Sequence, residues 1–127
     1  LMAAACPCGS GASFADCCRP YLRGDTVAPT AEALMRSRYT AFVRRDAGYL
    51  QRTWHPHTCP ATLDLDEVEW RGLEVLGVEG GGPGDDAGVV SFVAHHATGV
   101  VSMGALRETS RFVREDGRWL YVDGDVA

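Results

Sequence analysis

Four of the five cysteines in this 127-residue chain lie within its first eighteen residues, and their spacing favours a metal site. Cys6, Cys8, Cys17 and Cys18 follow the pattern Cys-x-Cys, eight intervening residues, Cys-Cys. Four thiolates match the softness and tetrahedral geometry of zinc, and a closed four-thiolate shell has no open position for catalysis. We therefore predict that zinc is the cofactor of this segment and that its role is structural.

A pair of disulfides is the alternative for the same four cysteines. A bond between the adjacent Cys17 and Cys18 would be strained. The chain shows no signal peptide and no membrane-spanning run, so we expect a cytoplasmic protein with reduced thiols. The isolated Cys59 is interpreted as a small apolar residue rather than a fifth ligand.

The segment from Cys6 to Cys18, with its Pro-Cys-Gly-Ser-Gly core and all four cysteines, resembles the SEC-C motif. This motif is a short zinc knuckle found at the C-terminus of the preprotein-translocase ATPase and in other bacterial proteins. Because the translocase knuckle engages a chaperone, the resemblance implies a zinc-dependent module that binds a protein or ribonucleoprotein partner. The alternative is that zinc only fastens the N-terminus to the rest of the chain.

Composition places the rest of the chain among ordinary globular proteins, with 46% hydrophobic and 23% charged residues. The net charge of −5 argues against non-specific nucleic-acid binding. Residues 19–52 hold seven arginines against three acids, which we interpret as a solvated helix surface.

The first half of the chain predicts helices. Residues 19–29 are interpreted as a linker because Pro20, Gly24 and Pro29 interrupt them. Thr30 is a typical N-cap for a helix ending near residue 45, and Asp46 caps a second helix over 47–54. Arg38 lies on the apolar stripe of the first helix, so we expect it to need a carboxylate or several carbonyls as partners.

The second half predicts strands at 68–78, 88–96 and 105–114, with a weaker approach at 99–103 and a glycine-rich loop at 80–88. Asp116-Gly117 indicates a type I′ turn between strands 105–114 and 118–123. One face of this hairpin is expected to point toward the helices and carries Glu108, Ser110, Phe112, Trp119, Tyr121 and Asp123. A slip of one residue in the turn would reverse that assignment.

The helices followed by strands indicate an α+β fold. Residues 34–42 (LMRSRYTAF), Trp54-His55-Pro56, residues 90–94 (VSFVA) and residues 107–112 (RETSRF), together with the knuckle, resemble the bacterial YchJ family. The resemblance implies a nuclear-transport-factor-2-like (NTF2-like, cystatin-like) cone, in which a curved antiparallel sheet wraps a long helix around a pocket. We expect the knuckle and linker to occupy residues 1–24 and the cone residues 25–127.

A pocket in the cone gives a second hypothesis, because folds of this shape host isomerases, dehydratases and hydrolases. Candidate pocket residues are Arg38, Tyr39, His55, Glu108, Tyr121 and Asp123. An Arg–carboxylate pair could hold an anionic substrate or polarise a carbonyl, whereas the same pair in a filled core is only structural. We favour a binding module over an enzyme, and no catalytic residue is assigned.

Overall fold

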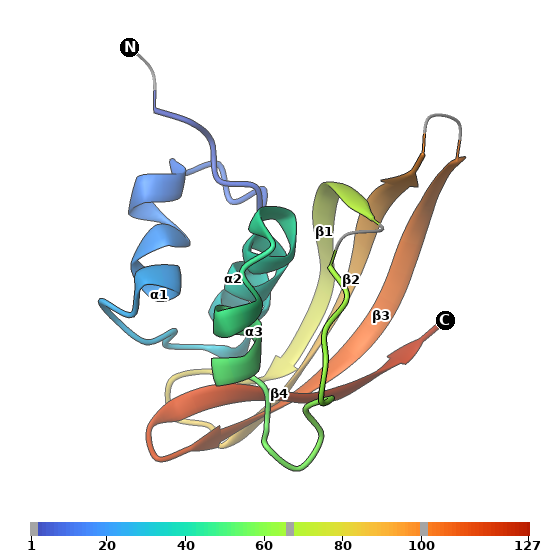
Figure 1. Ribbon diagram of the computed structural model, residues 1–127. Coiled ribbons are helices and arrows are strands. Elements are labelled where there is room, and N and C mark those ends of the chain that lie inside the picture. The colour runs from blue at the N-terminus through green and yellow to red at the C-terminus, as the bar shows by residue number, and fades with distance from the viewer. Residues whose placement is uncertain (1–2, 66–67, 100–101) are drawn as a thin grey trace.

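Helices precede strands along the chain, and the two kinds of element form two layers in a computed structural model (Figure 1). The structure describes residues 3–65, 68–99 and 102–127. This arrangement confirms the predicted α+β class. The elements in chain order are the 3₁₀ turn η1 (Phe14–Asp16), α1 (Arg19–Arg23), α2 (Ala31–Arg44), α3 (Ala47–Arg52), β1 (Glu69–Gly80), β2 (Ala87–Thr98), β3 (Ser102–Glu115) and β4 (Arg118–Val126).

The four strands form one antiparallel sheet in the order β1-β2-β3-β4. The sheet curves around α2 and α3, which lie on its concave side (Figure 1). The pairing of β1 with β2 is irregular, since its register shifts between Trp70 and Gly72. The predicted approach strand at 99–103 includes residues 100–101, which lie outside the described residues.

The turn between β3 and β4 has the predicted geometry. Asp116 and Gly117 have φ angles of 53° and 77°, the two positive values of a type I′ turn. Phe112 pairs with Tyr121, and Arg114 pairs with Trp119. This register places Phe112 and Trp119, which are 2% and 3% exposed, in the core against the helices.

A β-bulge beyond the turn overturns one prediction. Arg111 pairs with Asp123 while Phe112 pairs with Tyr121, so Val122 is an extra residue in β4. The bulge reverses the alternation of faces beyond it, and Asp123 joins Arg111 on the outer face. Gly124 takes the inward position instead, opposite Ser110.

Helix α2 contributes eight buried residues. Thr30 caps it as predicted, because its hydroxyl accepts a 3.0 Å hydrogen bond from the Ala33 amide. The Ala31 amide donates a 2.9 Å hydrogen bond to the Gly81 carbonyl, which seats the first turn on the β1–β2 loop. Gly81 must be small there, since a Cβ atom on it would lie 2.7 Å from the Cβ of Ala31.

Two helix boundaries differ from the predicted ones. Helix α3 ends at Arg52 rather than residue 54, because Trp54 forms a parallel bridge with Tyr121 of β4. The predicted linker contains the short helix α1. Pro20 lies in its first turn, where the missing N–H of a proline costs no helical hydrogen bond. The predicted loop at 80–88 is shorter, because β1 ends at Gly80 and β2 begins at Ala87.

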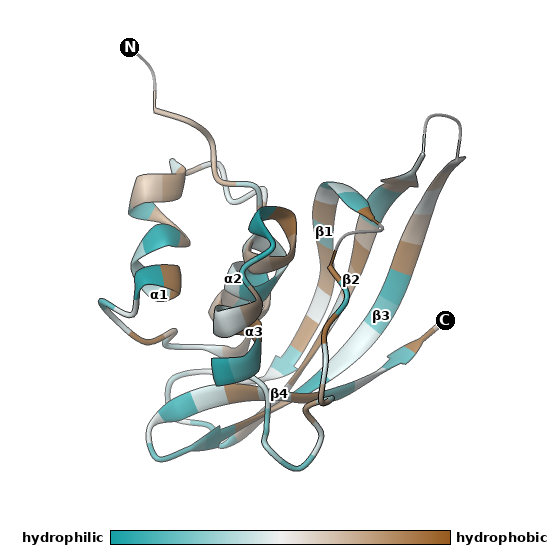
Figure 2. Cartoon of the chain, in the orientation of Figure 1, coloured by the Kyte–Doolittle hydropathy of each residue, from teal (hydrophilic) through white to brown (hydrophobic). Residues whose placement is uncertain are grey.

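The core lies between the helices and the sheet, where buried apolar residues of α2 cluster with those of β2, β3 and β4. Hydrophobic segments, brown in Figure 2, occur in both the helices and the strands. One part of the core joins the knuckle to the cone, since Cys6, Cys8 and Cys18 share an apolar cluster with Tyr39 and Ala94. Within the described residues, no helix has the length and apolar character needed to cross a membrane.

Candidate metal centre and candidate binding cavity

The four predicted cysteines come together at the N-terminus. Their sulfur atoms all lie within 4.8 Å of one another, a cluster that could bind a metal ion. The Cys17 sulfur is 3.6 Å from that of Cys8 and 3.9 Å from that of Cys18. Cys59 lies outside this cluster, and its thiol donates to the carbonyl of Pro60.

The chain between the two cysteine pairs folds back tightly. Gly9 and Gly11 have φ angles of 78° and 89°, which other residues rarely adopt. The Cys6 amide donates to the Ala12 carbonyl at 2.9 Å, closing the loop. The Ser10 hydroxyl lies 3.1 Å from the Cys17 sulfur, so it can donate a hydrogen bond to a thiolate there.

The thiols of the cluster differ in acidity. A hydrogen bond from Cys18 lowers the pKa of Cys8 to about 4, and the same interaction raises the pKa of Cys18. Burial raises the pKa of Cys17. The raised pKa values of Cys17 and Cys18 mean that a metal ion would have to displace their protons.

Helix α2 holds the knuckle against the cone through three kinds of contact. Arg36 donates a 2.8 Å hydrogen bond to the carbonyl of Cys8. The Cys6 sulfur lies 3.7 Å from the Thr40 hydroxyl. The guanidinium carbon of Arg44 lies 4.5 Å from the centre of the Phe14 ring, which is a cation–π contact.

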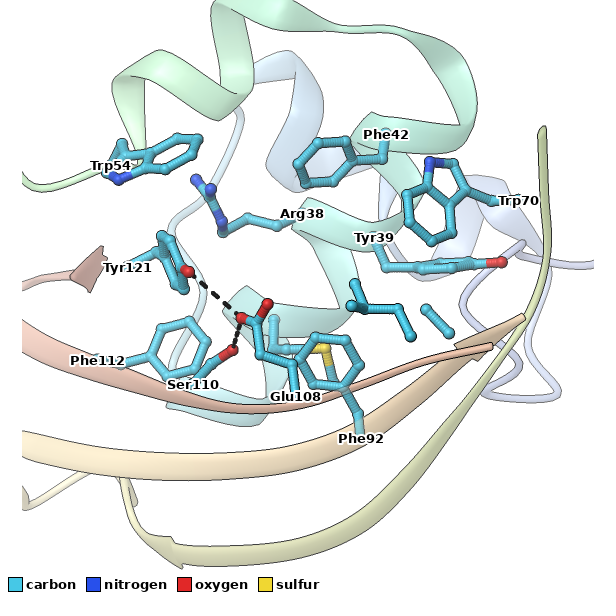
Figure 3. Close-up of a pocket in the computed structure, with 13 residues that line it drawn as sticks. Arg38, Tyr39, Phe42, Trp54, Trp70, Phe92, Glu108, Ser110, Phe112 and Tyr121 are labelled. Carbon is cyan, nitrogen blue, oxygen red and sulfur yellow. Dashed lines mark hydrogen bonds between the residues drawn. The ribbon is translucent and has the colours of Figure 1, made fainter. Parts of the chain in front are cut away.

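A separate cavity of about 280 Å³ lies between α2 and the concave face of the sheet (Figure 3). Its wall is mainly aromatic, with Tyr39, Phe42, Trp54, Trp70, Phe92, Phe112 and Tyr121. Met35, Ala94 and Leu106 complete the apolar part. Arg38, Glu108 and Ser110 are its polar residues apart from the tyrosine hydroxyls.

Arg38 is a buried cation in this wall, only 5% exposed. Its Nη1 donates to the Leu50 carbonyl at 2.9 Å and to the Thr53 hydroxyl at 2.7 Å. Its guanidinium carbon lies 4.8 Å and 4.6 Å from the ring centres of Trp54 and Tyr121. Burial lowers the pKa of Arg38 to about 10, so the group stays charged at neutral pH.

The predicted Arg–carboxylate pair does not form directly, because no salt bridge joins Arg38 to Glu108 in the part of the chain that the structure describes. Glu108 instead accepts hydrogen bonds from Ser110 at 2.5 Å and from Tyr121 at 3.3 Å, both at Oε2 (Figure 3). Burial and the neighbouring Glu108 raise the pKa of Tyr121, which keeps its hydroxyl protonated as the donor.

Four of the six predicted pocket residues line the cavity, namely Arg38, Tyr39, Glu108 and Tyr121. Two do not. His55 hydrogen-bonds through Nε2 to Glu115 at 2.9 Å, and its Nδ1 accepts from the His57 amide. Both ring nitrogens are therefore used in hydrogen bonds outside the cavity. Asp123 pairs with Arg111 at 2.5 Å on the outer face because of the bulge.

Sequence reasoning did not assign the aromatic wall to the site. Phe42 and Trp54 belong to apolar helical patterns, and Trp70 and Phe92 to strand patterns, and none of these patterns indicates a cavity. Aromatic residues make up only 9% of the sequence, so composition gives no signal either. Only the packing distinguishes a filled core from one with space in it.

The four-cysteine knuckle and the helix-and-sheet domain together define an NTF2-like protein that carries a SEC-C motif. The family description "YchJ, middle NTF2-like domain" matches residues 30–124, and "SEC-C motif" matches residues 2–20. The chain therefore belongs to the YchJ family, as predicted. Its relatives are named UPF0225 proteins.

Several relatives share about half of their residues with this chain. The UPF0225 protein SCO1677 of Streptomyces coelicolor is 51% identical over 121 residues, 94% of each chain. The UPF0225 protein of Chromobacterium violaceum is 54% identical over 129 residues, covering 98% of this chain and 94% of its own.

Two solved structures are similar over most of the chain. The solution structure of RPA3114, a SEC-C motif containing protein from Rhodopseudomonas palustris, has a TM-score of 0.85 and 34% identity over 99% of both chains. The crystal structure of a SEC-C motif containing protein from Psychrobacter arcticus has a TM-score of 0.73 and 30% identity, covering 96% of this chain and 82% of its own.

Proposed function

We propose that this chain is a small-molecule-binding protein whose cone takes a ring compound, and that a structural zinc ion fastens the knuckle to the cone. The observation that carries the proposal is the hollow of about 280 Å³ with a buried, charged Arg38 in its wall. Leaving both a void and a cation in a core is costly, and a ligand would offset both costs.

The size and lining of the cavity support a ligand of one or two rings. A cavity of about 150 Å³ accepts benzene, and the cavity here is about 280 Å³. Aromatic walls stack on flat molecules at ring separations of roughly 4.5–7 Å. The cavity is partly open to solvent, which gives such a molecule a way in.

The proposed function is tested by recording the NMR signals of residues that line the cavity while a ring compound is added. Trp54 and Trp70 line the cavity, so their indole NMR signals should shift as naphthalene binds. Leu106→Trp fills the half-buried edge of the cavity and should abolish those shifts, while Met103→Trp, at a side chain 78% exposed, should not. Unchanged indole signals in the wild-type protein would contradict the proposal.

The identity of the metal is supported by the spacing of the sulfurs. Four thiolates at about 2.3 Å from one zinc ion lie roughly 3.8 Å apart in a tetrahedron. The contacts of 3.6 and 3.9 Å around Cys17 agree with that spacing. Elemental analysis of tag-free protein should find one zinc per chain, and a protein with native stability and no metal would contradict this assignment.

A structural role for zinc is supported by burial, since Cys6, Cys8 and Cys18 are 5%, 0% and 1% exposed and face the cone. Docking of a protein or ribonucleoprotein partner by the knuckle stays a prediction. An untargeted pull-down with intact and Cys8→Ser protein tests it, and identical partner sets would contradict it.

A further inference from the structure

The polar wall of the cavity has unused hydrogen-bonding capacity of two opposite kinds. Arg38 uses only Nη1 for its bonds to Leu50 and Thr53, so Nε and Nη2 have no partner among the described residues. Neither nitrogen is among the fully enclosed polar atoms that lack a partner, so each keeps some accessible surface, and Arg38 itself lines the cavity. Arg38 therefore presents free N–H donors beside the aromatic wall.

Glu108 supplies the complementary acceptor. Ser110 and Tyr121 both donate to its Oε2, which leaves Oε1 without a hydrogen bond in the described part of the chain (Figure 3). Oε1 is likewise absent from the enclosed atoms that lack a partner. The Glu108 carboxylate therefore offers a charged acceptor to a ligand N–H or O–H.

Tyr121 fixes the relation between these two groups. Its ring centre lies 4.6 Å from the guanidinium carbon of Arg38, and its hydroxyl lies 3.3 Å from Oε2 of Glu108. The donor thus lies over the face of the phenol ring and the acceptor at its hydroxyl end. Their charges cancel, so a neutral ligand leaves no net charge in the cavity, whereas a ligand carboxylate placed at Arg38 would be repelled by Glu108.

We infer that the cavity recognises a neutral, flat, one- or two-ring compound whose polar edge carries a carbonyl next to an N–H, as in a lactam or cyclic amide. The carbonyl accepts from Arg38, the N–H donates to Glu108, and the rings stack against the aromatic wall. This inference rests on the proposed small-molecule function and adds the chemical class of the ligand.

The test is a calorimetric titration of the full chain with four bicyclic probes of similar size. Carbostyril carries the lactam edge, N-methylcarbostyril only the carbonyl, naphthalene neither group, and naphthoate an anion. We expect carbostyril to bind at least about tenfold more tightly than the other three, since hydrogen bonds to charged groups are the stronger ones. Indole shifts of Trp54 and Trp70 report whether each probe occupies the cavity.

Two variants assign the preference to its residues. Glu108→Gln should cut the advantage of carbostyril over N-methylcarbostyril by about tenfold, because it removes the charge of the acceptor. Arg38→Lys should weaken both carbonyl compounds and leave naphthalene unchanged, because lysine lacks the planar fork. Thermal melting of both variants checks that they are folded. The comparison of the four probes on the wild-type protein tests the ligand class even if a variant fails to fold.

The outcomes separate the two levels of the proposal. Equal binding of carbostyril and naphthalene inside the cavity would keep the small-molecule function and overturn the lactam class. Tightest binding of naphthoate would overturn the neutral class in favour of anions. Failure of all four probes to bind would overturn both the class and the proposed function.

Discussion

The guanidinium of Arg36 donates a 2.8 Å hydrogen bond to the carbonyl oxygen of Cys8. Arg36 belongs to α2 and Cys8 to the knuckle, so this bond fastens the metal-site loop to the cone without involving the metal. The same arginine pairs with Glu32 at 3.0 Å one turn earlier, which orients its side chain. This arginine therefore helps to hold the knuckle independently of the four cysteine side chains.

Arg36→Met should loosen the knuckle while leaving the metal site intact. The change removes the hydrogen bond to Cys8 and keeps most of the packing of the side chain. We expect a loss of about 1–2 kcal/mol in the free energy of unfolding, measured by urea titration, with unchanged zinc content. Arg23→Ala, which breaks an exposed 3.7 Å pair with Asp25, is the control and should change stability by less than about 0.5 kcal/mol.

Removal of the metal should destabilise the cone as well as the knuckle. Cys6, Cys8 and Cys18 pack in one apolar cluster with Tyr39 and Ala94, so losing the knuckle exposes part of the core. We expect chelation or Cys8→Ser to lower the melting temperature by at least about 10 °C, the equivalent of roughly 3 kcal/mol. Cys59→Ser, outside the cluster, is the matched control. A cone that melts at the same temperature with and without metal would contradict this coupling.

Gly124→Ala should disturb the cavity from the sheet side. A Cβ atom at this position would collide with the Glu108 carboxylate, which must then leave its bonds to Ser110 and Tyr121. We expect a loss of about 1–2 kcal/mol by urea titration, since buried hydroxyls lose their acceptor. Gly77→Ala has open space around it and serves as the control. Equal stability of the two variants would show that Glu108 is not held as described.

Stability should fall in alkaline solution above a pH of about 10. Burial raises the pKa values of Tyr39, Tyr49 and Tyr121 above the ordinary 10.0, so the folded chain holds protons that the unfolded chain releases. The stability these groups contribute is complete below pH 10 and is lost as the pH rises through their folded pKa values. The raised pKa of Tyr21 adds to this decline, and the depressed pKa of Arg38 opposes it.

Urea titrations from pH of about 8 to about 11 measure this dependence. Tyr121→Phe removes one of the raised groups and should make the decline shallower. A decline of equal steepness in the variant would exclude Tyr121 as a contributor.

Local signals in the sequence predicted the parts of the fold that depend on neighbouring residues. The Asp116-Gly117 turn fixed the register of its hairpin, because positive φ at two successive residues restricts the turn type. The cysteine spacing predicted the metal-site cluster for the same reason, since all four ligands lie close together in the chain.

Features set by packing were harder to predict. Nothing in the sequence marks Val122 as the extra residue of a bulge. Regular alternation along β4 therefore predicts that Asp123 faces the helices, which is wrong. The partners of Arg38 were predicted as a carboxylate or several carbonyls, whereas the structure uses the Leu50 carbonyl, the Thr53 hydroxyl and two aromatic faces. The helix after Asp46 bends back to bring these groups together, and the sequence pattern does not encode that contact.

The close contact between Ala31 and Gly81 couples the position of α2 to the loop between β1 and β2. Ala31 and Arg38 lie on the same face of α2, two turns and about 10 Å apart, so a rigid helix carries any tilt at its first turn to the guanidinium. The space at residue 81 therefore constrains where the first turn of α2 lies, and with it the position of Arg38. A larger side chain at residue 81 is expected to move Arg38 within the cavity without changing any of the residues that line it.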